Sequence, residues 1–216
     1  MATSSGTSPQ TDLNPLAAGY SASNYRKHMS SNPVQRLLIS RFHRQIADRI
    51  AAMAPESFLD AGCGEGFVAK MLLERVPGLK LTGFDFDPAA VKLAQTANPT
   101  CDFTTASIFE IPYPDQSFDV VGCFEVLEHQ TDPVPALREL ARVAKRAVII
   151  SVPHEPFFSL SNAARGKNWD VRPRGSDPDH KQLWSRAALG AFVSQELDVA
   201  WLGGSFPWTI CIGTKR

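Results

Sequence analysis

Cysteine is scarce in this sequence, and neither sign of charge is in excess. The 216 residues include four cysteines, which form no CxxC pair and no cluster with histidine. This spacing predicts neither a disulfide scaffold nor a zinc site, and no other metal site is expected. Lysine plus arginine and aspartate plus glutamate both number 22, so the formal net charge is zero. Nucleic-acid-binding proteins usually carry excess positive charge, so nucleic acid is not expected as a partner.

Long apolar runs are also missing. No stretch reaches the length of a transmembrane helix, and the first residues, MATSSGTSPQT, lack the basic and apolar regions of a signal peptide. Together with thiols that are expected to be reduced, these absences predict a cytoplasmic protein. Residues 1–19 are rich in Ser, Thr, Pro, Gly and Ala, which predicts a disordered tail. Residues 20–216 are expected to form a single domain.

The rest of the sequence alternates short apolar segments with amphipathic ones. Strands are expected at residues 57–60, 79–84, 101–105, 118–124 and 147–152, with two terminal strands at 197–202 and 208–213. Helices are expected to begin near Pro33, Phe67, Pro88, Pro133 and Ser185. Strands that alternate with helices at this spacing predict an α/β fold. We expect a Rossmann-like doubly wound sheet, mostly parallel, with an antiparallel C-terminal strand.

A glycine-rich loop stands between the first strand and its helix, in the segment FLDAGCGEG of residues 58–66. Glycine lets the backbone approach a ligand closely, and the helix N-terminus behind the loop favours a negative group. The dinucleotide fingerprint G-x-G-x-x-G would require glycine where Phe67 stands. This departure, and the lack of a Tyr-x-x-x-Lys pair, weakens the hypothesis of an NAD(P)-dependent oxidoreductase but leaves it open.

Three further segments follow this loop in order: LTGFDFDP, ASIFEIPYPDQSFDVV and CFEVLEH. Together the four segments cover residues 57–152 and resemble the class I S-adenosylmethionine-dependent methyltransferases, particularly the small-molecule, type 11-like branch that contains quinone-biosynthesis enzymes. The resemblance implies S-adenosyl-L-methionine as cofactor and methyl transfer to a small-molecule acceptor, with oxygen slightly preferred over nitrogen or carbon. A catalytically silent module that only binds the cofactor is a further alternative.

The resemblance also implies which residues contact the cofactor. Asp85 ends the second strand, where the family keeps an acid on the ribose hydroxyls, and a carboxylate can accept both hydrogen bonds. Asp60 would hold the methionine amino group or fix the glycine loop, and Phe86 would pack on adenine or belong to the core. Ser107 stands where related enzymes often have an acid, beside a backbone N–H at Ile108. The residues expected at the cofactor are Asp60, Gly62, Cys63, Gly64, Asp85, Phe86, Ser107, Ile108 and Phe124.

Residues 153–184 interrupt the alternation and are expected to form an acceptor-binding insert. His154 directly follows the fifth strand, and His180 lies late in the insert. Each is a candidate general base, or alternatively a loop histidine that hydrogen-bonds the backbone. His129 is interpreted as part of a structural turn. Tyr25, near the N-terminus, is a candidate to close over the cofactor.

The composition of the insert suggests an aromatic or an anionic acceptor. Its aromatic side chains would line an apolar pocket, and its cations would hold a negative group. Alternatively, the aromatic residues anchor the insert on the sheet, and nearby acids balance the cations on a solvated surface. The aromatic residues are Phe157, Phe158, Trp169 and Trp184, and the cations are Arg165, Lys167, Arg172, Arg174 and Lys181.

Overall fold

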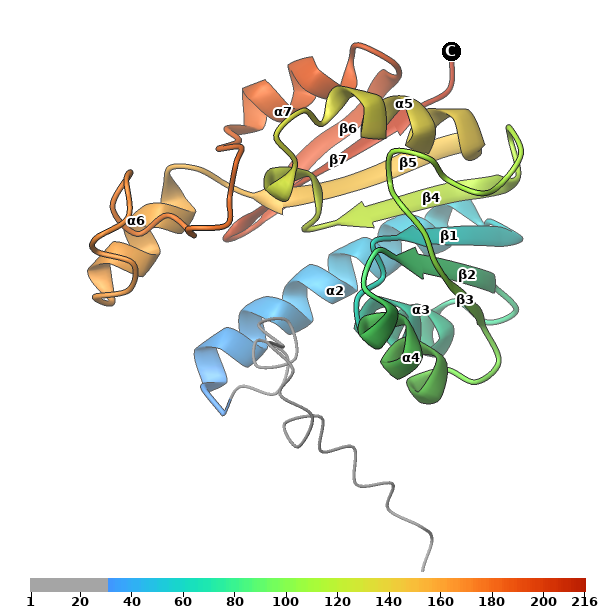
Figure 1. Cartoon of the computed structure of the whole chain (residues 1–216), viewed down its shortest axis with the longest axis horizontal. Coiled ribbons are helices and arrows are strands. Elements are labelled where there is room, and N and C mark those ends of the chain that lie inside the picture. Colours follow the sequence, from blue (N-terminus) through green and yellow to red (C-terminus); the bar gives the residue numbers. More distant parts are fainter. Residues whose placement is uncertain (1–30) are drawn as a thin grey trace, which may run out of the picture.

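Seven strands form one sheet in the computed structural model, which describes residues 31–216 (Figure 1). The order across the sheet is β3-β2-β1-β4-β5-β7-β6. The first five strands run parallel, whereas β7 is antiparallel to both β5 and β6. The predicted fold class is therefore confirmed. The strands are β1 (Ser57–Ala61), β2 (Lys80–Asp85), β3 (Asp102–Thr105), β4 (Phe118–Phe124), β5 (Ala144–Pro153), β6 (Asp198–Ser205) and β7 (Trp208–Thr214).

Helices cover both faces of the sheet (Figure 1). Two of them, α2 (Pro33–Met53) and α3 (Phe67–Arg75), pack on one face, and α5 (Val134–Val143) and α7 (Arg186–Val193) pack on the other. Consecutive residues of the central strands, such as Phe58 and Leu59, are buried toward opposite faces because side chains alternate along a strand. Burial on both faces explains why these strands are apolar throughout.

The sequence marks where several helices begin. Asn32 accepts hydrogen bonds from the backbone N–H of Val34 and Gln35, and Asp87 accepts one from Ala89 at the start of α4 (Pro88–Ala97). Ser185 caps α7 in the same way. Side-chain oxygens at these positions satisfy backbone donors that have no partner within the helix. The predicted helix starts at these positions are confirmed.

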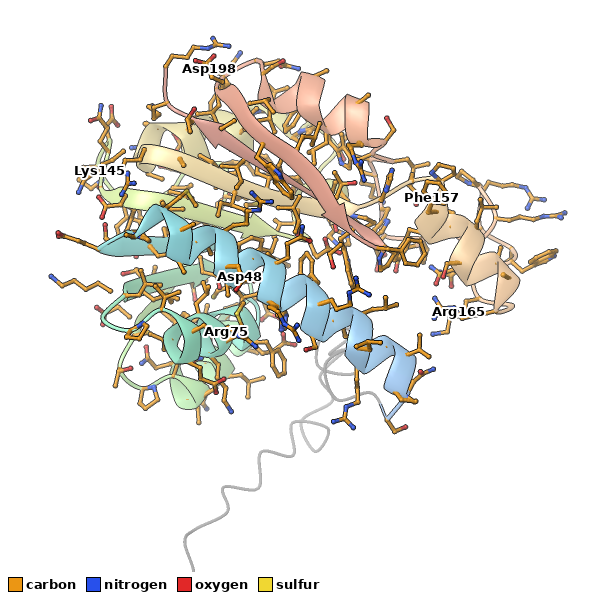
Figure 2. The ribbon with its side chains drawn as sticks, turned by 180° about the vertical axis from the view of Figure 1, so that it is seen from behind. Asp48, Arg75, Lys145, Phe157, Arg165 and Asp198 are labelled. Atoms are coloured by element: carbon orange, nitrogen blue, oxygen red, sulfur yellow. The ribbon has the colours of Figure 1, made fainter. Side chains whose placement is uncertain are left out.

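The segment after β5 differs from the prediction, because it contains the helix α6 (Phe157–Ala164). The buried Glu155 carboxylate accepts hydrogen bonds from the N–H and the hydroxyl of Ser159, which fixes the first turn. The helix projects beyond the sheet, with Phe157 at its start and Arg165 at its far end (Figure 2). The expected tail at residues 1–19 and Tyr25 lie outside the described residues. No helix within residues 31–216 is long and apolar enough to cross a membrane.

Candidate functional site

A cleft of about 1310 Å³ opens at the carboxyl ends of the parallel strands. One wall comes from the first turns of α2, at Val34, Gln35 and Leu38, and the other from α6 and the chain after it. In Figure 1, α6 and the start of α2 both lie toward the left, at the end of the sheet to which the arrows of β4 and β5 point. In open α/β sheets, ligands bind in the crevice at this end of the strands. The described part of the chain therefore has a ligand-sized cleft where its fold predicts one.

The glycine loop forms the base of this cleft. Its backbone is tied to the end of β2, because the N–H groups of Gly62 and Cys63 both donate to the carbonyl of Phe84, at 2.8 and 2.9 Å. Gly62 has a φ of 78°, and a Cβ there would lie 2.5 Å from a methyl group of Val126. A side chain would be strained and would collide with the turn after β4. The loop consequently presents bare backbone at Gly62 and Gly64 to the cleft.

The third glycine of the loop serves packing between helices. Gly66 has a φ of 79°, and a Cβ there would lie 3.0 Å from Cα of Ala94 in α4 and 2.6 Å from Nδ2 of Asn98. That amide donates to the Gly66 carbonyl at 3.1 Å. The third glycine is thus needed at position 66, whereas the dinucleotide fingerprint places it at position 67, where this chain has Phe67.

Asp85 connects the loop with the turn after β2 and also lines the cleft. Its Oδ2 accepts a hydrogen bond from the N–H of Gly64 at 2.9 Å, and its Oδ1 accepts one from Asp87 at 3.0 Å. A carboxylate has about four lone-pair sites, so acceptor capacity is left on both oxygens. The carboxylate can therefore hold the loop and still accept hydrogen bonds from a pair of ligand hydroxyls.

Asp60 is buried beneath the same loop. Its Oδ2 has no hydrogen-bond partner among the described residues. Burial, and secondarily the carboxylate of Asp85, raises the pKa of Asp60 to about 7. The side chain borders a recess of about 50 Å³ that shares Gly62 and Phe124 with the main cleft. A buried carboxylate oxygen that lacks a donor suits a ligand with a positively charged group nearby.

The other predicted cofactor residues surround the same end of the cleft. Phe86 is 83% exposed and lines it, so the alternative of a core role is not supported. Ile108, in the loop after β3, and Phe124, at the end of β4, are buried and line it. Ser107 also lines it, but its hydroxyl already accepts a hydrogen bond from the N–H of Phe109. Cys63 is buried and borders the recess, where burial raises the pKa of its thiol.

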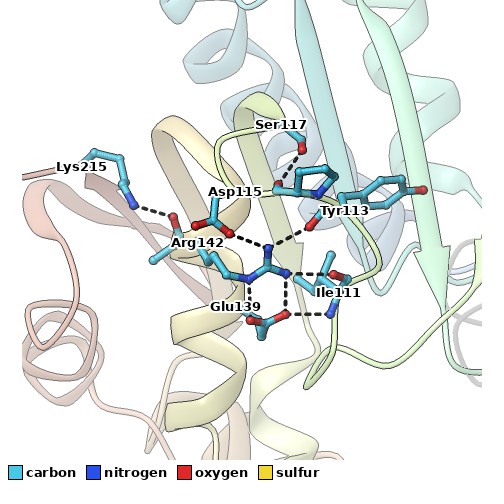
Figure 3. A network of polar contacts seen from close by, with 9 residues as sticks. Ile111, Tyr113, Asp115, Ser117, Glu139, Arg142 and Lys215 are labelled. Carbon is cyan, nitrogen blue, oxygen red and sulfur yellow. Dashed lines mark hydrogen bonds and ion pairs between the residues drawn. The ribbon is translucent and has the colours of Figure 1, made fainter.

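A polar network holds the segment of residues 111–115, which follows Ser107 and Ile108 in the chain (Figure 3). Arg142 of α5 donates to the carbonyls of Ile111 and Tyr113 at 2.9 and 2.8 Å. It also pairs with Glu139, which in turn accepts the N–H of Ile111 at 2.8 Å. The guanidinium lowers the pKa of the Glu139 carboxyl, and that carboxylate raises the pKa of Arg142. The network fixes the backbone of a segment that has no regular structure.

Glu125 lies at the junction of the recess and the main cleft. It adopts a φ of 58° directly after β4. Its carboxylate accepts hydrogen bonds from the indole N–H of Trp208 at 2.6 Å and from the hydroxyl of Ser151 at 3.1 Å. Trp208 also lines the cleft and packs on Phe42 of α2 with ring centroids 4.7 Å apart. No local sequence pattern indicates this tryptophan as a site residue, because it comes from the antiparallel strand β7.

The structure brings one of the two candidate bases to the cleft. His180 lines it, together with His129. His154 does not line it. The imidazole of His154 packs on Phe157, and its backbone N–H donates to the Pro207 carbonyl. Burial, and secondarily the positive charge of the nearby Arg186, lowers the pKa of His154. The interpretation of His129 as a turn residue agrees with its place in the short helix η2 (Leu127–His129), but the same residue faces the cleft.

Only part of the insert's aromatic and basic residues reaches the cleft. Phe158, Arg165 and Lys167 line it. Trp184 is instead buried against Phe192 of α7, as the anchoring alternative expected. The exposed Trp169 stacks under Arg174, with 4.9 Å from the guanidinium to the ring centroid. Of the predicted aromatic residues and cations, Phe158, Arg165 and Lys167 therefore reach the site, where the acids Asp177 and Asp179 also line the cleft.

Comparisons with known proteins find methyltransferases. Residues 59–152 match the family model described as a methyltransferase domain. The ubiquinone biosynthesis O-methyltransferase of Hahella chejuensis is 34% identical over 173 residues, which are 73% of this chain and 69% of that protein. A "Probable S-adenosylmethionine-dependent methyltransferase" of Mycobacterium tuberculosis is 33% identical over 122 residues, which are 55% of this chain. The chain spans 44% of the length of that mycobacterial protein.

Solved structures show the same fold. The crystal structure of a SAM dependent methyltransferase from Aquifex aeolicus has a TM-score of 0.61 with this chain at 17% identity, and the alignment covers 79% of this chain and 89% of that chain. At this identity the likeness concerns the fold alone. The sequence relationship to the Hahella protein and the matched domain model confirm the resemblance seen in the four motifs: the chain belongs to the S-adenosylmethionine-dependent methyltransferases.

Proposed function

We propose that this chain is an enzyme that transfers a methyl group from S-adenosyl-L-methionine to a small-molecule acceptor. The observation that carries the proposal is the pair of carboxylates at the ends of neighbouring strands, Asp60 on β1 and Asp85 on β2, beside the glycine loop. Asp85 has spare acceptor capacity for two ribose hydroxyls. Asp60 has a buried oxygen that a cationic group would satisfy. The cofactor carries both kinds of group, so the residues present fit it.

The chain's own residues divide the work along the cleft. Phe86 and Ile108 offer apolar surface for the adenine, and Asp60 and Asp85 fix the charged and hydroxyl-bearing parts. When bound, the cofactor supplies a methyl group activated by its sulfonium charge. Transfer is an in-line displacement, so alignment of the two reactants and exclusion of water supply much of the rate. The ordered loop and the walls from α2 and α6 are suited to both tasks.

The acceptor is proposed to occupy the end of the cleft toward α6. The cleft of about 1310 Å³ exceeds the 300–1,000 Å³ of ordinary small-ligand pockets, which leaves room for two reactants. Phe158 would contact an aromatic acceptor, and Arg165 and Lys167 would attract an anionic one. We propose an oxygen atom as the methylated site, which the name of the Hahella relative supports.

A ligand comparison tests the cofactor. Thermal unfolding is measured with S-adenosylmethionine, S-adenosylhomocysteine, NADH or buffer alone. A ligand at a hundred times its dissociation constant adds about 2.7 kcal/mol of stability. For a domain of this size the midpoint should rise by roughly 5–10 °C with the two adenosyl-sulfur ligands. A rise with NADH alone would overturn the proposal in favour of an oxidoreductase.

Turnover is tested separately with a panel of aromatic hydroxyl and carboxylate compounds, by measuring formation of S-adenosylhomocysteine. His180→Ala and His154→Ala form a matched pair for this assay. The first should slow transfer by roughly a hundredfold or more if His180 acts on the acceptor, whereas the second should have little effect. Binding of S-adenosylhomocysteine without turnover on any compound would favour a silent cofactor-binding module.

A further inference from the structure

Three metal-ligating side chains converge at the acceptor end of the cleft: Glu128, His129 and His180. One ligand atom from each lies within 4.8 Å of the other two, and the centroids of the two imidazole rings are 5.1 Å apart. All three residues line the cleft. Within residues 31–216 no other group of three such side chains is found. We propose that this triad binds a divalent transition-metal ion, with Zn²⁺ as the first candidate.

The fold holds the triad together through its backbone. Glu128 and His129 belong to η2, directly after β4, whereas His180 comes from the insert. The N–H groups of Lys181 and Gln182 both donate to the carbonyl of Glu128, at 2.7 and 3.0 Å. The side-chain amide of Gln182 donates in addition to the carbonyl of Thr131 at 2.9 Å. These bonds fix His180 beside the turn without using any ligand atom of the triad.

A second observation concerns the orientation of one imidazole. Nδ1 of His129 lies 3.3 Å from the carbonyl oxygen of Asp179. In the tautomer that donates this hydrogen bond, Nε2 carries a lone pair, which is the form that binds a metal. Metal-ligating histidines usually donate their other ring N–H to a carbonyl or a carboxylate. The insert therefore supplies both a ligand, His180, and the group that orients another ligand.

The donor set indicates the class of metal. Two imidazoles and one carboxylate are typical of catalytic Zn²⁺ and of non-haem Fe²⁺, whereas Mg²⁺ prefers oxygen alone. Glu128 is 1% exposed, and a cation beside it would stabilise its buried charge. Tetrahedral zinc ligands lie roughly 3.4 Å apart, given bonds of about 2.1 Å. Small rotations of the exposed His129 and half-buried His180 side chains would close the triad around an ion.

Such an ion would deepen the proposed methyltransferase function, on which this consequence rests. Three protein ligands leave a coordination position open toward the cleft. An acceptor with a hydroxyl oxygen would bind there, and the ion would lower the pKa of that hydroxyl so that its proton leaves to solvent before methylation. His180 would then act on the acceptor through the ion rather than as a general base. The preferred acceptors would be compounds with a metal-binding hydroxyl.

The test measures metal binding alone, without cofactor or acceptor. Untagged full-length protein is stripped with a chelator and titrated with Co²⁺, followed by visible absorption, and with Zn²⁺, followed by calorimetry. The variants His129→Ala and His180→Ala each remove one ligand, and His154→Ala is the matched control that keeps all three. Circular dichroism and binding of S-adenosylhomocysteine verify that each variant is folded.

We expect one equivalent of metal in the unmodified protein and in His154→Ala, with affinity reduced at least tenfold in the other two variants. Absence of saturable one-equivalent binding in the unmodified protein would overturn the proposal. Equal affinity in all four proteins would overturn it too, because the ion would then lie elsewhere. Stabilisation by S-adenosylhomocysteine in a protein that binds no metal would leave the methyl-transfer proposal standing.

Discussion

Asp85 accepts the backbone N–H of Gly64 at 2.9 Å and thereby joins the end of β2 to the loop after β1. The same carboxylate lines the cleft, where we propose that it also binds the ribose hydroxyls of the cofactor. Its removal should affect cofactor binding more than the loss of a surface acid elsewhere.

Asp85→Ala is expected to weaken binding of S-adenosylhomocysteine by at least tenfold. Each hydrogen bond to a charged group contributes about 1.5–3 kcal/mol, and two ribose hydroxyls would lose theirs. Isothermal titration calorimetry measures the change. The control is Asp102→Ala, which removes an exposed acid at the start of β3. Equal affinity in the two variants would mean that the ribose is held by other groups.

Asp60 is expected to release a proton when S-adenosylhomocysteine binds. In the free protein its pKa is about 7, and a ligand ammonium beside the carboxylate would lower that pKa. At pH 6 the free protein therefore holds a proton that the complex does not, so affinity should rise with pH and level off above about 7. Calorimetry at pH 6 in buffers of different ionisation enthalpy detects the released proton. Asp60→Asn should abolish the release, and heats independent of the buffer would contradict the assignment.

The raised pKa of Asp60 also affects the stability of the ligand-free protein. The folded state holds this proton more tightly than the unfolded chain, whose ordinary aspartate pKa is 3.8. The contribution of Asp60 to the free energy of unfolding is therefore present at low pH and is lost as pH rises toward about 7. Urea unfolding of Asp60→Asn should lack this decline, whereas an unchanged pH profile would argue for an ordinary pKa.

Much of the sheet could be predicted because its strands are local apolar runs with clear boundaries. The strand predicted at residues 118–124 matches β4 at both ends. The helix α6 was missed because it lies in a segment rich in proline, glycine and aromatic residues, and its first turn is fixed by Glu155, a contact that no periodicity reveals. Propensity is a weak guide where a single tertiary contact decides the local structure.

Motifs indicate the residues that we propose at the cofactor end of the cleft, whereas no motif indicates the residues at the other end. Position at a strand end favoured His154, yet the structure turns its ring onto Phe157. The pairing of His129 with His180 depends on backbone hydrogen bonds from the insert to Glu128, about fifty residues earlier in the chain. Trp208 reaches the cleft because β7 runs antiparallel beside β5. Such contacts depend on topology and have no local signature.

Gly66→Ala is expected to destabilise the protein more than Gly78→Ala. Both glycines have positive φ, 79° and 81°, so both substitutions impose backbone strain of roughly 1–2 kcal/mol. Only at Gly66 would the new Cβ meet another helix, at Ala94 and Asn98; at Gly78 nothing lies within 4 Å. Denaturant unfolding of the two variants isolates the packing contribution. Equal losses would mean that α3 and α4 adjust to the added methyl group.

Arg142→Ala is expected to lower both stability and cofactor affinity. The side chain holds the carbonyls of Ile111 and Tyr113 and pairs with Glu139 and Asp115 (Figure 3). Its loss should cost about 2–3 kcal/mol of unfolding free energy, because hydrogen bonds to charged groups are lost and the Glu139 carboxylate keeps only one partner of two. Ser107 and Ile108 lie just before Ile111 in the same loop, so S-adenosylhomocysteine should also bind several-fold more weakly.

A second arginine on the same helix provides the control. Arg138 pairs with Glu196 at 2.8 Å, but its side chain is 66% exposed and it touches no loop carbonyl. Exposed ion pairs contribute at most about 1 kcal/mol, so Arg138→Ala should change stability little and cofactor affinity not at all. Chemical unfolding and calorimetry on both variants separate the two roles. If Arg142→Ala lost stability but kept full affinity for S-adenosylhomocysteine, the loop would hold its ligand-binding geometry without the network.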